Sequence, residues 1–172
     1  MSAPFGVDRL AQFRRVRSTL AVRVVTSVVL EVLLLSTAIT GLVAWASPAG
    51  VDDDVPHEAY GGLAVAVTGG ALAMLALTVA AVHARAALAP ALARGGPVDP
   101  KRVAAGWRAC VIGTYTAFIG YAAGISTGVI NSVVARNFIP TWVVLTSGGL
   151  VLLVVLIVRR GLAAILRWLP RA

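Results

Sequence analysis

Glu31 is the residue whose type and position point most directly to chemistry. It lies inside a long apolar run, about eight residues, or roughly 12 Å, from the start of that run. A charged carboxylate in hydrocarbon is costly, so the group must be neutral, hydrogen-bonded or in contact with water inside the protein. The same depth in the next apolar runs is reached at Thr78, Thr114 and Tyr115, whose hydroxyl groups are candidate partners.

Two hypotheses follow for this intramembrane polar site. In the first, Glu31 binds a proton or a cation in a small transporter or channel. In the second, it is a protonated, satisfied contact that fixes the register of the helices. The second hypothesis is the simpler one, and the Glu31→Gln variant separates the two.

Other residue types that carry chemistry are sparse in this chain. Cys110 is the single cysteine, so an internal disulfide or a cysteine metal site is excluded. His57 and His83 fall about a membrane thickness apart, roughly 30 Å, and cannot share one haem in a monomer. The acidic segment 52–54 beside His57 has groups that bind a cation loosely, but a solvated loop is the preferred interpretation. We expect no catalytic site, metal or cofactor.

Four apolar runs of membrane length must position these residues. The chain is 59% hydrophobic and 13% charged, whereas soluble domains carry about 25% charge. A spanning helix needs about 20 mostly apolar residues, and backbone facing lipid must be hydrogen-bonded within its own helix. The predicted spans are residues 24–45, 61–82, 109–130 and 141–158.

The basic residues predict how these spans are oriented. All Lys and Arg residues except Arg136 fall on one side of the predicted spans. The positive-inside rule therefore places both termini in the cytoplasm and accounts for the net charge of +8 without a nucleic-acid partner. Heavy use of Ala, Val, Gly and Arg suggests a bacterial source, hence the inner membrane. A cleaved signal peptide ending at Ala44-Trp45-Ala46 is the alternative for the first span.

Two stretches beside the spans are amphipathic. Residues 1–20 carry apolar side chains at helical spacing with arginines between them, and residues 162–169 show a similar pattern. We expect both to be interfacial helices on the membrane surface, where their arginines reach lipid phosphates. Anionic lipids are therefore candidate partners, although plain anchoring explains the pattern as well.

Small residues form a stripe in each of the two middle spans. They recur at spacings of four and three residues, which lets two helix backbones approach closely in a membrane. The simplest interpretation is that the stripes pack on each other, and the alternative is a contact between copies of the chain. The glycines predicted to serve helix packing are Gly62 and Gly69 in one span and Gly113, Gly120, Gly124 and Gly128 in the other.

Two short segments resemble known proteins. The loop Arg94-Gly95-Gly96-Pro97-Val98-Asp99 resembles a turn in some small bacterial four-span membrane proteins of uncharacterised function, which implies architecture alone. The segment Thr26–Val32 is similar to the first span of the small multidrug transporters. Their Trp-Ser-Gly-type segment is absent here, so that resemblance implies nothing further.

The sequence thus predicts an all-α fold, a four-helix transmembrane antiparallel bundle with both termini inside and flanking interfacial helices. The preferred function is a non-enzymatic accessory or scaffold subunit of a larger inner-membrane complex. The alternative is a small homo-oligomeric proton- or cation-coupled transporter or channel that uses Glu31.

Overall fold

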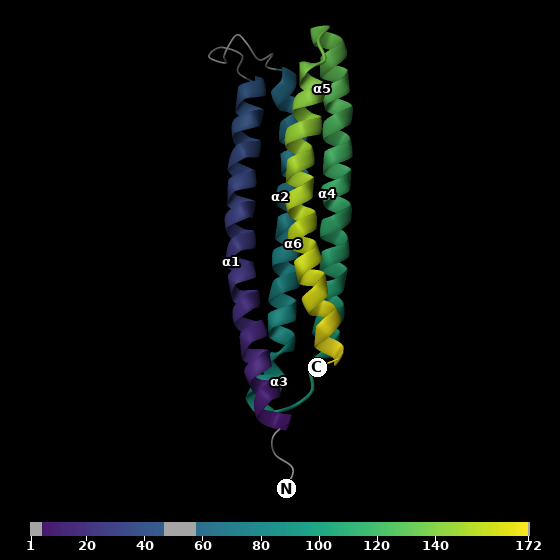
Figure 1. The fold of residues 1–172 in the computed structure, drawn as a ribbon. Coiled ribbons are helices and arrows are strands. Elements are labelled where there is room, and N and C mark those ends of the chain that lie inside the picture. Colours follow the sequence, from purple (N-terminus) through teal and green to yellow (C-terminus); the bar gives the residue numbers. More distant parts are fainter. Residues whose placement is uncertain (1–4, 47–57, 172) are drawn as a thin grey trace.

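The computed structural model describes residues 5–46 and 58–171, and this part of the chain is helical without a strand (Figure 1). The prediction of an all-α fold is confirmed for these residues. The elements in chain order are α1 (Phe5–Ala46), α2 (Glu58–Ala87), α3 (Ala89–Arg94), α4 (Pro100–Ala135), α5 (Ile139–Val143), the π-helix η1 (Val144–Gly148), α6 (Gly149–Trp168) and the 3₁₀ turn η2 (Leu169–Arg171).

Four helical stretches are long and apolar enough to cross a membrane, as predicted. They are Arg9–Ala46, Tyr60–Ala93, Pro100–Ala135 and Ile139–Trp168. Each is longer than the predicted span within it. The 42 residues of α1 extend over roughly 63 Å, about twice the thickness of a hydrocarbon core. The helices therefore extend well beyond the apolar zone.

The two stretches expected on the membrane surface are not separate helices. α1 runs without a break from Phe5 to Ala46, because the sequence has neither proline nor glycine between residues 7 and 40. The second stretch likewise continues α6. Their apolar side chains pack inside the protein: Leu20, Leu162 and Leu166 are at most 1% exposed. The amphipathic pattern marks a face that other helices cover.

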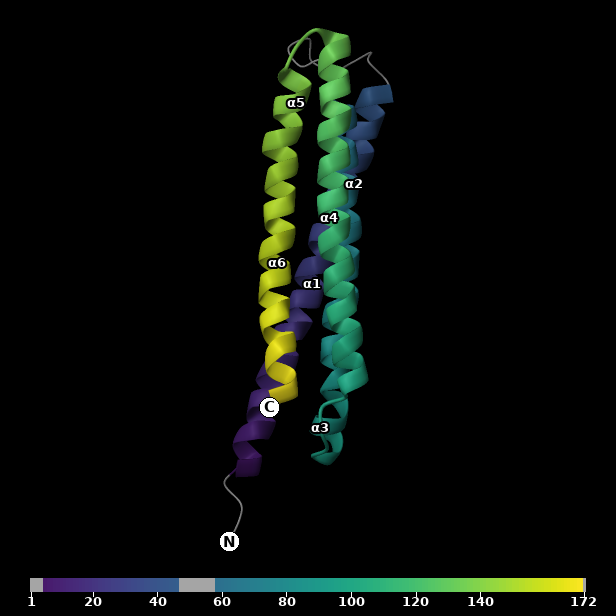
Figure 2. The ribbon, with the colours of Figure 1, turned by 90° about the vertical axis from the view of Figure 1, so that its right-hand side faces the viewer.

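α2 is the central helix of the molecule. In the most apolar 18-residue segment of each stretch, 56% of the segment is buried in the stretch that contains α2. The buried share is 17% for the stretch of α1, 22% for that of α4 and 17% for that of α6. α1 packs against α2 and α3, whereas α4 packs mainly against α2, and α6 packs against both α2 and α4. Figures 1 and 2 show α1 and α4 on different sides of α2.

The small-residue stripes of α2 and α4 pack on each other, backbone against backbone. A Cβ atom built on Gly69 would lie 2.5 Å from the Cα of Gly120. One built on Gly124 would lie 2.8 Å from the carbonyl oxygen of Gly62, and one on Gly113 would lie 3.0 Å from that of Ala73. No side chain larger than hydrogen fits at the centre of this seam, so the glycines set how closely the two helices approach.

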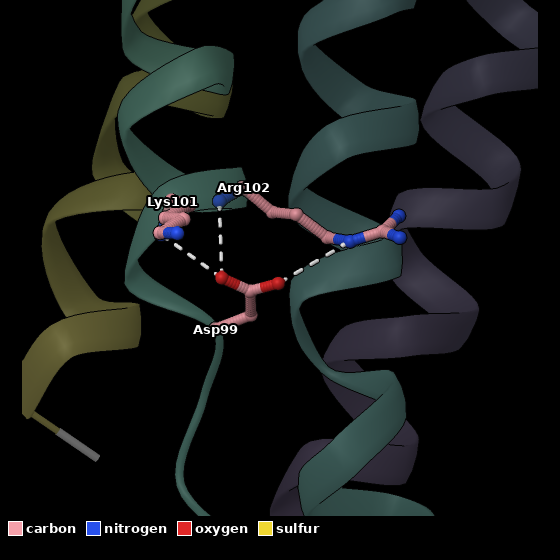
Figure 3. A network of polar contacts seen from close by, with 3 residues as sticks. All are labelled: Asp99, Lys101 and Arg102. Carbon is pink, nitrogen blue, oxygen red and sulfur yellow. Dashed lines mark hydrogen bonds and ion pairs between the residues drawn. The ribbon is translucent and has the colours of Figure 1, made fainter.

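The turns use the chemistry that the sequence offers. Asp99 caps α4: its Oδ1 accepts hydrogen bonds from the backbone N–H of Lys101 at 2.9 Å and of Arg102 at 3.4 Å, and its Oδ2 pairs with the Arg102 guanidinium at 3.4 Å (Figure 3). Gly95 ends α3 with a φ of 63°. At the other end of α4, Arg136 adopts a φ of 53°, and its N–H bonds the carbonyl oxygens of the last turn.

Candidate functional site

Glu31 lies on the packed face of α1. Ser27 and Ala38, four residues before and seven after it, are only 2% and 3% exposed, and the spacing puts Glu31 on the same helix face. Glu31 itself is half-buried. Within residues 5–46 and 58–171, its carboxylate has neither a hydrogen bond nor an ion pair. The side chain therefore lies at a helix interface without a polar partner among the described residues.

The hydroxyl groups expected near Glu31 bond elsewhere. Thr78 donates to the carbonyl oxygen of Met74 at 3.0 Å, and Thr114 donates to that of Cys110 at 2.7 Å, each one turn back in its own helix. Tyr115 is 66% exposed on α4. Because α1 and α4 pack against different parts of α2, the structure does not bring Glu31 together with Thr114 or Tyr115. A functional role for Glu31 stays a prediction.

Two arginines that the sequence analysis used only for orientation are partly inside the structure. The Nε atoms of Arg23 in α1 and Arg159 in α6 are buried and have no hydrogen-bond partner in the described chain. The guanidinium group of Arg23 covers Gly161 of α6, where it occupies the space a Cβ atom would need. The lack of a side chain at Gly161 therefore lets the Arg23 side chain cross from α1 to α6.

A pocket of about 760 Å³ opens at the end of the molecule where α3 lies, and we call it the end pocket. It is formed by the first turns of α1, by α3, by the loop before α4, by the first turns of α4 and by η2. Its lining is mostly apolar, and Arg9 is the charged residue among the described side chains that line it. The lining residues are Arg9, Leu10, Phe13, Ala91, Gly95, Gly96, Pro97, Val98, Pro100, Val103, Ala104, Trp107, Leu169 and Pro170.

Aromatic contacts fix two walls of the end pocket. The ring of Phe13 meets that of Trp168 edge to face, with centroids 5.9 Å apart. The Arg167 guanidinium lies 5.8 Å from the ring centroid of Trp107. The sequence pattern alone does not predict this pocket. Helical periodicity assigns residues to faces, but it does not show where three helix ends leave a space.

The remaining predicted features add no further site. The acidic segment 52–54 and His57 lie outside the described residues. Among the residues that are described, no three His, Cys, Asp or Glu side chains gather as metal ligands would. Cys110 is buried at 1% exposure in the α2–α4–α6 core, where it serves packing.

Comparison of the chain with models of known families, with characterised proteins and with solved structures finds no match.

Proposed function

We propose that this chain is a multi-pass protein of the bacterial inner membrane, an antiparallel bundle with both termini in the cytoplasm, that serves as a non-enzymatic accessory or scaffold subunit of a larger complex. The four long apolar helices support membrane insertion. The basic residues support the orientation, because the described ones other than Arg136 lie toward the end of the molecule that carries α3 and η2.

The observation that carries the proposal is how the polar groups inside the helices are used. Thr68, Thr78 and Thr114 each donate to a carbonyl oxygen one turn back in their own helix. At the centre of the α2–α4 seam, backbone meets backbone at Gly69 and Gly120. A transport path requires polar groups from several helices to face a shared space. These three threonines instead bond within the helices that carry them, which supports a structural subunit.

Gentle solubilisation of native membranes, followed by affinity purification and native mass measurement, tests the proposal. Foreign subunits that co-purify in fixed stoichiometry support an accessory subunit. An isolated monomer or a homo-oligomer, recovered in several mild detergents, refutes it.

The orientation has its own test. A fluorescent protein that matures only in the cytoplasm, fused after Ala172, should be bright, and a dark fusion at normal expression contradicts the proposed orientation.

A small proton- or cation-coupled transporter is the second candidate. It is favoured by the carboxylate of Glu31 at the α1 interface, which has no polar partner in the part of the chain that the structure describes. The purified chain in liposomes, loaded with a pH-sensitive dye, should then pass protons or exchange a cation for them. The Glu31→Gln variant should lose this flux. Ser36→Ala is the matched control, because Ser36 is an exposed residue of the same helix whose hydroxyl bonds only its own backbone. Equal flux in all three proteins, or none, removes this candidate.

A further inference from the structure

We propose that the end pocket binds one anionic phospholipid of the cytoplasmic leaflet, with the phosphate at Arg9 and an acyl chain toward Phe13 and Trp107. The inference rests on the membrane orientation proposed above. The proposed lipid binding is a property of the isolated chain, so it does not depend on the partner subunits of the proposed complex.

The size and lining of the end pocket suit an amphiphile. Its volume of about 760 Å³ lies within the range of roughly 300–1,000 Å³ that is usual for ligand sites. Aliphatic and aromatic side chains line most of it, and among the described side chains one guanidinium group, that of Arg9, is exposed in the lining. A long apolar group with one negative charge at its end matches this distribution.

The pocket also has a direction along the molecule. Arg9 lies one turn closer to the start of α1 than Phe13, and Pro100 lies about 10 Å before Trp107 along α4. Phe13, Val103 and Trp107 therefore lie at the side nearer the apolar spans, and Arg9 and Gly95 lie at the far side. A lipid of the cytoplasmic leaflet has the same order, with its chains toward the membrane centre and its phosphate toward the cytoplasm.

The pocket lies beside the end of α6. In both ribbon views α1 and α3 extend beyond the end of α6 (Figures 1 and 2). Leu169 and Pro170, just after α6, form one boundary of the pocket. The pocket is therefore bounded by α1, α3, α4 and the residues just after α6.

The charge around the pocket favours an anion. Lys101 and Arg108 are exposed on α4, and Arg167 is exposed on α6, where its guanidinium group lies over the Trp107 ring of the pocket lining. The carboxylate of Asp99 is engaged by the α4 backbone and by Arg102. Each basic residue near a membrane surface attracts anionic lipid by an amount that corresponds to about fivefold in affinity.

The experiment measures thermal unfolding of the full chain in a neutral detergent with added phosphatidylglycerol, phosphatidylcholine or inorganic phosphate, together with native mass spectrometry of retained lipid. We expect phosphatidylglycerol alone to raise Tm and to remain bound as one molecule per chain. Arg9→Gln should weaken this binding about fivefold. Ala104→Trp, which places an indole at an exposed position in the pocket lining, should abolish it.

Arg14→Gln is the matched control, because it removes an exposed arginine of α1 outside the pocket and should preserve the bound lipid. Several results would overturn the proposal. They are equal stabilisation by phosphatidylcholine or by inorganic phosphate, lipid retention that survives Ala104→Trp, and equal losses in Arg9→Gln and Arg14→Gln. Stabilisation by an acidic amphipathic peptide without any lipid effect would also overturn it and assign the pocket to a protein partner.

Discussion

Replacing Gly120 by alanine tests the closest helix contact in the protein. The added methyl group would lie 2.5 Å from the Cα of Gly69, whereas carbon atoms in favourable contact are about 3.5–4.0 Å apart. α2 and α4 must therefore separate by roughly 1 Å at this point. Gly113 and Gly124 make close contacts along the same seam, and these would loosen together.

The size of the effect follows from two opposing contributions. Overpacking a close contact costs about 1–3 kcal/mol. Gly→Ala in a helix regains about 1 kcal/mol through helix propensity. Gly149→Ala isolates the second contribution, because a Cβ atom there meets only the Tyr121 ring and hydroxyl, at 3.4 Å or more. The two variants should differ in stability by about 1–3 kcal/mol, with Gly120→Ala the less stable.

Thermal unfolding in detergent, followed by far-ultraviolet circular dichroism, measures this difference. This difference corresponds to roughly 2–12 °C in Tm for a chain of this size. Gly69→Ala should have a similar effect, and the double variant should cost less than the sum, because either methyl group alone already separates the helices. If Gly120→Ala is as stable as Gly149→Ala, the glycines do not set the approach of α2 and α4, and the reasoning is refuted.

Three further predictions concern the turns. Asp99→Ala removes the cap of α4 and should lower the free energy of unfolding, measured with denaturant, by about 0.5–2 kcal/mol. Asp99→Asn should retain most of the stability, because asparagine also caps helices. Equal losses in the two variants would show that the charge of Asp99, rather than capping, matters. Arg136→Gly should stabilise the protein by up to about 1 kcal/mol, because Arg136 has a positive φ that glycine adopts without strain. Gly95→Ala should destabilise the protein, because alanine would be strained at the positive φ of Gly95. Shifts in Tm opposite to these would contradict the prediction. Ser132→Ala should lower the free energy of unfolding by about 1–3 kcal/mol. The buried Ser132 hydroxyl accepts a hydrogen bond from the Thr141 N–H at 3.1 Å and shares one with the Thr141 hydroxyl at 2.7 Å. An unchanged Tm would show that this link between α4 and α5 is dispensable.

Much of the local structure could be predicted from residue types alone. Four apolar runs of membrane length become four long helices, since backbone in hydrocarbon must satisfy its own hydrogen bonds. Asp99 before Pro100 marks the start of α4, because a carboxylate accepts from the free N–H groups of a first helical turn. The glycine spacing in α2 and α4 identified faces on which backbones can approach.

The partners of those faces were decided by the tertiary structure. The apolar stripe of residues 10–20 has the same periodicity whether it meets lipid or protein, and the structure covers it with neighbouring helices. The same ambiguity holds for Glu31, whose depth matches Thr114 although α2 lies between their helices. Periodicity along one helix says which residues share a face. Only the packing of the four helices decides what covers that face, where Arg23 crosses to α6, and where α1, α3, α4 and η2 enclose a pocket.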